Sequence, residues 1–86
     1  MKQDKTKSKL LRIGQLAKQT GELVTTIRFW ISEGLLMAEE YTQGGFQLFN
    51  PAMVGRAKEI RRLQNEERLT IAEIKNRLKS GKKGNL

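Results

Sequence analysis

The side chains best suited to specific binding lie close together at residues 25–29. Thr25 and Thr26 offer hydroxyl and methyl groups, whereas Arg28 offers a forked guanidinium and Phe29 an aromatic face. A guanidinium can donate two parallel hydrogen bonds to guanine or to a phosphate, and threonine can bond a phosphate or contact a thymine methyl group. The alternative for Arg28 is an ordinary surface salt bridge with a nearby glutamate.

Catalytic chemistry has little support in this chain. Histidine and cysteine are both absent, so the commonest general base and the usual ligands of structural zinc are missing, and no disulfide can form. Glu39 and Glu40 are adjacent in a segment expected to be a strand, which points their carboxylates to opposite faces. No nucleophile accompanied by a base is visible. We therefore expect no enzyme, no metal site and no cofactor.

Apolar residues around the 25–29 cluster predict two short helices joined by a turn. The first helix should cover about residues 13–20, because its apolar residues recur at helical spacing and Gly21 accepts the left-handed conformation in which helices often end. The second helix should begin near Val24. Because two adjacent helical residues cannot both point inward, we expect Trp30 in the core and Phe29 partly exposed.

A β-hairpin is predicted between the second helix and the single proline. There, on both sides of the turn Thr42–Gly45, the spacing between apolar residues shifts toward every second position, which is typical of strands. A simple connection would account for the glycines completely. In the functional interpretation the hairpin is a wing that lies along a phosphate backbone. Its donors would then be the backbone amides of Gly44 and Gly45 and the side-chain amides of Gln43 and Gln47.

Asn50-Pro51 predicts the start of a third helix, because asparagine caps free amides and proline tolerates the first helical position. This helix should run from Pro51 to about Gln64. Its polar face carries Lys58, Arg61 and Arg62. These cations form either a second phosphate contact or a solvated helix face.

A fourth helix should begin at the capping box formed by Thr70 and Glu73, whose side chains can bond each other's backbone amides. Gly81 should end it. We expect a single folded domain over residues 10–80, followed by a disordered tail over residues 81–86.

The net charge of +8 is concentrated at the two ends of the chain. Residues 1–12 sum to +4 and residues 51–86 to +6, whereas residues 13–50 sum to −2 and contain only Lys18 and Arg28 as cations. Such a distribution suggests a polyanionic partner whose nonspecific attraction comes from the ends. The first part, residues 1–9, is expected to be a flexible basic arm. The alternative is that the charge only maintains solubility.

From Leu11 to Leu78 the chain resembles the DNA-binding domain of the MerR family of bacterial transcription regulators. The matching segments are, in order, Ile13–Ala17, Thr20-Gly21, Thr26–Trp30, Gly34–Leu36, Gly45–Phe49 and Leu69–Leu78. Several linked motifs in order are much more specific than any one of them. The resemblance implies a winged helix-turn-helix whose second helix contacts DNA through Thr25, Thr26, Arg28 and Phe29, together with residues of the wing and of the third helix.

The chain also departs from the family pattern. Leu23 stands where the family usually has a small hydroxyl residue, which predicts a less well capped recognition helix. Trp30 and Phe49 replace tyrosines. Glu39, Glu40 and Gln47 occupy a wing that usually carries arginines. The long dimerising helix and the effector domain of family regulators have no counterpart here.

These observations predict a mainly α fold, a winged helix-turn-helix of four short helices with one β-hairpin wing. The expected function is sequence-specific binding of double-stranded DNA by a MerR-like transcription regulator without an effector domain. Two alternatives are an excisionase-like architectural DNA-binding factor and a protein-interaction module that binds RNA polymerase or another regulator. The isolated chain is expected to be mainly monomeric, cytoplasmic and associated with the nucleoid. No membrane partner is expected, because no apolar run approaches the length of a span.

Overall fold

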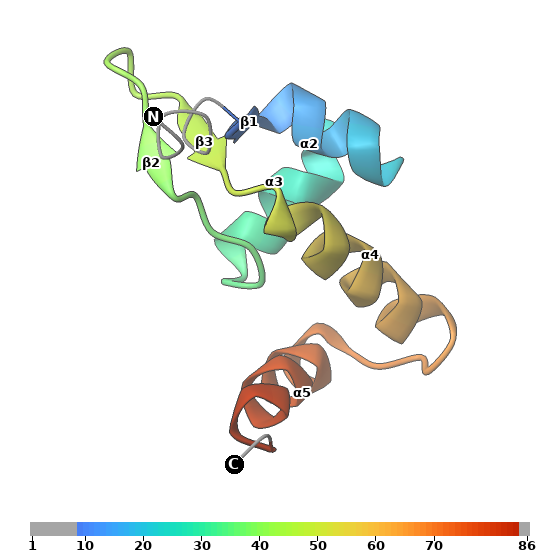
Figure 1. Ribbon diagram of the computed structural model, residues 1–86. Coiled ribbons are helices and arrows are strands. Elements are labelled where there is room, and N and C mark those ends of the chain that lie inside the picture. Colours follow the sequence, from blue (N-terminus) through green and yellow to red (C-terminus); the bar gives the residue numbers. More distant parts are fainter. Residues whose placement is uncertain (1–8, 85–86) are drawn as a thin grey trace.

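Helices and a small sheet alternate along the chain in the order expected of a winged helix-turn-helix (Figure 1). The computed structural model describes residues 9–84. Within this range the elements are β1 (Leu11–Arg12), α2 (Ile13–Thr20), α3 (Val24–Ser32), β2 (Glu40–Tyr41), β3 (Gln47–Phe49), α4 (Ala52–Asn65) and α5 (Ile71–Gly84). The four predicted helices and the predicted hairpin are therefore confirmed. None of these helices is long and apolar enough to span a membrane.

The turn between α2 and α3 is fixed by hydrogen bonds to the last carbonyl groups of α2. Gly21 has a left-handed backbone, with φ of 78°, and its amide donates to the carbonyls of Ala17 and Lys18. The hydroxyl of Thr20 donates to the carbonyl of Leu16 over 2.9 Å. At the start of α3, Leu23 occupies the cap position without a side-chain hydrogen bond, as the sequence predicted. The geometry of the turn consequently comes from the end of α2.

The sheet has a third strand that the sequence did not predict. β1 pairs antiparallel with β3 through Leu11 opposite Phe49 and Arg12 opposite Leu48, which gives the strand order β1-β3-β2. A strand of two residues is too short to show a period of two, so no pattern marked it. Because β1 runs directly into α2, this pairing holds the start of α2 beside the hairpin.

The hairpin turn is closed at its base by backbone hydrogen bonds. The amide of Thr42 donates to the carbonyl of Phe46 over 2.8 Å, and the amide of Gly45 donates to the carbonyl of Thr42 over 2.9 Å. Gly45 has φ of 87°, a conformation that is costly for residues with a Cβ atom. The glycine is thus required by the turn itself, whatever the hairpin contacts.

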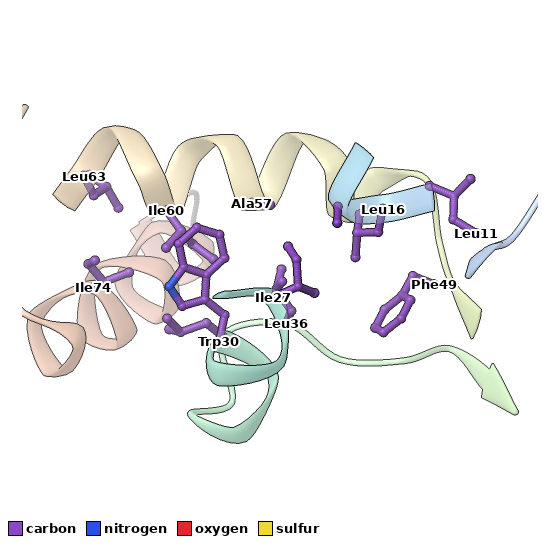
Figure 2. Packing of buried hydrophobic residues seen from close by; sticks show 12 residues of the cluster. Leu11, Leu16, Ile27, Trp30, Leu36, Phe49, Ala57, Ile60, Leu63 and Ile74 are labelled. Carbon is purple, nitrogen blue, oxygen red and sulfur yellow. The ribbon is translucent and has the colours of Figure 1, made fainter. Parts of the chain in front are cut away.

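The core lies between α2, α3 and α4, and it extends to the sheet at one end and to α5 at the other. In Figure 2 the side chains of Ile27 and Trp30 point from α3 toward α4. Trp30 is buried and Phe29 is 47% exposed, so both predictions for this pair are confirmed. Burying a large apolar side chain stabilises the folded state by about 1.5–3 kcal/mol. Twelve buried residues build the core of this small domain. They are Leu11, Leu16, Ala17, Ile27, Trp30, Leu35, Leu36, Phe49, Ala57, Ile60, Leu63 and Ile74.

The two C-terminal helices begin as predicted, but the last one ends later. At the start of α4 the side-chain oxygen of Asn50 accepts a hydrogen bond from the amide of Ala52 over 2.8 Å. At the start of α5, Thr70 and Glu73 form the reciprocal capping box. The helix then continues through Gly81 to Gly84, so the predicted end at Gly81 was wrong. A single helical glycine costs only about 1 kcal/mol, which neighbouring lysines, good helix formers, can offset.

This result also corrects the predicted tail, because the backbone of residues 81–84 is helical. Residues 85–86, and the predicted basic arm except Lys9, lie outside the described residues.

Candidate nucleic-acid interface

A hollow of about 720 Å³ lies where α2, α3 and the hairpin meet. Three cationic side chains line it, namely Arg12 from β1, Lys18 from α2 and Arg28 from α3. The hairpin contributes the exposed aromatic rings of Tyr41 and Phe46. The pairing of β1 with β3 brings Arg12 to this surface, and the turn at Gly21 sets the position of Arg28 relative to Lys18. We refer to this surface as the cationic hollow.

The three cations of the cationic hollow have no carboxylate partner among residues 9–84. Every ion pair found in this range involves Arg61, Arg62 or Arg77 instead. Glu39, one of the glutamates near Arg28 in the sequence, accepts a hydrogen bond from Asn50 over 2.9 Å. The surface salt bridge considered for Arg28 is therefore not formed with any described residue. Three cations without carboxylate partners on a concave surface are suited to contact a polyanion.

The structure brings together only part of the predicted site. Lys18, Arg28 and Gln47 line the cationic hollow. Thr25 and Phe29 are exposed elsewhere on α3, and Thr26 is half-buried there. Gln43 and Gly44 are exposed in the hairpin turn, outside the lining, and Lys58 is exposed on α4. Gly45, whose backbone amide was predicted as a donor of the wing, also lines the hollow, and the lining residues that sequence reasoning missed are Arg12, Ile13, Gly14, Gln15, Tyr41 and Phe46.

Arg12 was missed because its position depends on β1, which no sequence pattern indicated. Tyr41 and Phe46 did carry a signal, since both belong to the predicted hairpin and are aromatic. Successive residues of a strand point to opposite faces, so an aromatic side chain of a hairpin can face solvent. Both rings are 64% exposed, which leaves them available for contact with a ligand.

Arg61 belongs to a different environment from Arg28. Its Nε donates to Oε2 of Glu22 over 2.8 Å, and its Nη2 donates to the second oxygen of the same carboxylate. The guanidinium also lies 5.5 Å from the centroid of the Trp30 ring, within range of a cation–π interaction. The hydrogen bonds to Glu22 raise the pKa of Arg61 above its usual value. Arg61 therefore attaches α4 to the turn that precedes α3.

Arg62 lies in a network of exposed carboxylates. It donates to Glu59 over 2.7 Å and to Glu67 over 3.3 Å, and Glu67 also accepts a hydrogen bond from Arg77. The bond with Glu59 raises the pKa of Arg62 and lowers the pKa of Glu59. The predicted cluster of Lys58, Arg61 and Arg62 is thus divided, because carboxylates neutralise both arginines.

Sequence reasoning missed the Glu22 pair because the two residues are 39 positions apart. The partners of Arg62 are local, and Glu59 at a spacing of three residues was a visible signal.

The chain is similar to known bacterial proteins over most of its length. It is 42% identical over 53 residues to the nodulation protein NolA of Bradyrhizobium elkanii, which covers 62% of this chain and 24% of NolA. It is 38% identical over 64 residues to NolA of Bradyrhizobium sp. strain NC92, which covers 74% of this chain and 27% of that protein. The chain thus spans about a quarter of the length of these curated relatives.

The fold also matches a solved structure. The transcription regulator PbrR691 from Ralstonia metallidurans CH34, solved in complex with lead(II), superposes with a TM-score of 0.77 at 36% identity. The match covers 88% of this chain and 59% of the PbrR691 chain. Among the described residues of the present chain, no group of three His, Cys, Asp or Glu side chains is placed to hold a metal ion. The family model of the MerR helix-turn-helix regulatory proteins matches residues 11–81, and the chain belongs to this family.

Proposed function

We propose that this chain regulates transcription by binding a specific sequence of double-stranded DNA through the cationic hollow. One observation carries the proposal: Arg12, Lys18 and Arg28 converge from three elements on one concave surface without a carboxylate partner among residues 9–84. Membership of a family of helix-turn-helix regulators supports DNA as the polyanion. When unpaired cations contact phosphates, counterions that were condensed on the DNA are released, and this release favours binding.

In this proposal α3 enters the major groove and the hairpin lies along the adjacent backbone. Arg28 donates to a base edge or to a phosphate, and the exposed Thr25 and Phe29 contact the groove wall. Lys18 and Arg12 bind phosphates on the side of α2. Donors from the hairpin and from the neighbouring elements complete the interface: Thr26, Gln43, Gly44, Gln47 and Lys58. Arg61 and Arg62 are no longer included, because carboxylates already occupy their donors.

The lysines of residues 1–9 add nonspecific attraction to phosphates. The isolated chain is mainly monomeric, because Ile71, Ile74 and Leu78, the apolar residues of α5, pack against the core of the same chain. The chain has no catalytic role, and it works in the bacterial cytoplasm, on the nucleoid. A protein partner such as RNA polymerase or a second regulator would need a different surface.

Selection of bound duplexes from a random pool, repeated at two salt concentrations, tests this function. We expect enrichment of one sequence motif, and an affinity that falls with salt in proportion to the phosphates engaged. Recovery of the pool without enrichment would contradict sequence-specific binding. Enrichment of several adjacent sites on bent DNA would indicate an architectural factor of the excisionase type. The absence of any bound duplex at low salt would reject DNA as the partner.

A further inference from the structure

A second hollow, of about 260 Å³, lies between α4, α5 and the loop that follows α3. Its apolar lining consists of Leu35, Met37 and Leu78, and its charged lining consists of Arg56, Lys75 and Lys79. It shares no lining residue with the cationic hollow. In Figure 1, α5 lies at the opposite end of the domain from the hairpin. A molecule bound in this second hollow therefore leaves the residues of the cationic hollow free.

The charged lining of the second hollow is not neutralised by residues 9–84. No carboxylate lines it, and none of its three cations forms an ion pair in this range. Arg56 donates its Nε to the carbonyl of Leu35 over 2.6 Å, which uses one of the five guanidinium donors. Lys75 and Lys79 are four residues apart on one helix and repel each other. An anion placed between them would remove this repulsion.

Part of the apolar lining of the second hollow is exposed to solvent. Met37 is 62% exposed, although the neighbouring Leu35 and Leu36 are buried in the core. Leu78 is half-buried and forms one wall. A methionine side chain is flexible and polarisable, so it adapts to the shape of a bound apolar group. We refer to the apolar lining residues Leu35, Met37 and Leu78 as the floor of the second hollow, which three cationic side chains line as well.

We propose that the second hollow binds an acidic amphipathic segment of a partner protein. An apolar side chain of the partner occupies the floor beside Met37 and Leu78, and carboxylates on either side of it pair with Arg56, Lys75 and Lys79. A phosphate backbone would satisfy the cations but has no apolar group to fill the floor, so the lining favours a peptide over a nucleic acid. The separation of the two hollows allows the partner and DNA to bind together.

A synthetic helical peptide tests this assignment. It carries leucine and phenylalanine on one stripe with glutamates on both sides, and it is titrated into the isotopically labelled chain while amide chemical shifts are recorded. We expect saturable changes centred on Met37, Lys75 and Leu78. A second peptide with lysines in place of the glutamates should not bind.

Variants of the chain separate this site from the DNA-binding surface. Lys75→Glu combined with Lys79→Glu should weaken peptide binding by about tenfold or more, because two attractive charges become repulsive. Binding of duplex DNA should change little. Asn76→Glu, on the same helix but outside the lining, serves as the matched control and should keep peptide affinity. Lys18→Glu should have the opposite effect, because it should weaken binding of DNA but leave the affinity for the peptide unchanged. Thermal melting checks that each variant folds.

Met37→Ala provides a further test that does not alter charge, and because Met37 is exposed the fold should remain intact. This substitution should measurably weaken binding of the acidic peptide. The proposal is overturned if the acidic peptide does not bind at millimolar concentration, or if the double charge reversal leaves its affinity unchanged. It is also overturned if the same amides shift on dilution of the free chain, which would indicate self-association, or on addition of duplex DNA, which would indicate a nucleic-acid contact.

Discussion

Arginine side chains have contrasting surroundings in two regions of this domain. Arg12 and Arg28 line the cationic hollow without a carboxylate partner among the described residues. On α4 and α5, by contrast, Arg61, Arg62 and Arg77 are all bonded to glutamates. The segment with the negative net charge thus supplies the unpaired arginine Arg28, whereas the strongly basic C-terminal segment neutralises much of its charge internally. The pairing of charges therefore distinguishes these two groups of arginines, whereas the net charge of the segments does not.

The paired arginines also differ from one another. The side chain of Glu22 is only 10% exposed, and its partner Arg61 also lies 5.5 Å from the centroid of the Trp30 ring. Arg62 and its partners are all substantially exposed. Exposed ion pairs contribute little to stability, whereas removing the partner of a largely buried carboxylate leaves that group unsatisfied. Arg61 is therefore expected to stabilise the position of α3, and Arg62 is not.

The largest expected effect comes from the unpaired region. Arg28→Ala should lower the affinity for the selected duplex by about 1–3 kcal/mol and relax the preference at one base position, because a forked contact is lost. Stability should change little, since Arg28 is exposed. Competition binding with duplexes varied at each position measures this. Uniform binding by mutant and parent across all sequences would remove Arg28 from the interface.

The next largest effect is expected for the ion pair between Arg61 and the largely buried Glu22. Arg61→Ala should lower the free energy of unfolding by about 1–2 kcal/mol, a value reduced because Arg61 itself is 40% exposed. Chemical denaturation gives the free energy of unfolding. Glu22→Gln is the informative companion, because it keeps a hydrogen-bond acceptor and should cost less. Equal stability of Arg61→Ala and the parent would show that the bond to Glu22 contributes nothing.

A smaller effect is expected for Arg62→Ala, the matched variant on the same helix. Its ion pairs are exposed, so the change in stability should be well below that of Arg61→Ala and should vanish at high salt. DNA affinity should remain unchanged. If Arg62→Ala weakened DNA binding as strongly as Arg28→Ala, internal pairing would not separate the two regions.

The smallest effect concerns pH. Arg62 lowers the pKa of Glu59 below its usual value of 4.5, so the ionised carboxylate stabilises the folded state above that value. This contribution is lost as the pH falls through the lowered pKa. Glu59→Gln should therefore be slightly less stable than the parent near neutral pH, and the difference should disappear well below pH 4.5. Thermal melts across this range provide the measurement, and a difference that grew on acidification would have the wrong sign.

Local signals in the sequence predicted most of the elements. Gly21 marked the end of α2, the capping box of Thr70 and Glu73 marked the start of α5, and adjacency on a helix assigned Trp30 to the core and Phe29 to the surface. Each of these rests on contacts within a few residues. The features that were missed depend on contacts distant in sequence, as for β1 and for Arg61.

The site shows the same division. Arg28 was predicted from its type and its helix, whereas Arg12 joins it only because β1 pairs with β3. Arg61 is basic and lies off the apolar stripe of α4, as a residue that contacts phosphate would. No local sequence signal indicated Glu22 as its partner. Side-chain type therefore indicates which chemistry is available, and tertiary pairing decides where it can be used.

The most direct test of the central claim is a titration of the isotopically labelled chain with the selected duplex, followed by amide and arginine side-chain resonances. The claim is that unpaired cations of the cationic hollow, and not the paired arginines of α4, bind DNA. We predict that the largest changes occur at Arg12, Lys18 and Arg28, while the Nε resonances of Arg61 and Arg62 stay close to their positions in the free chain. Changes centred on Arg61 and Arg62, with the cationic hollow unaffected, would contradict the account.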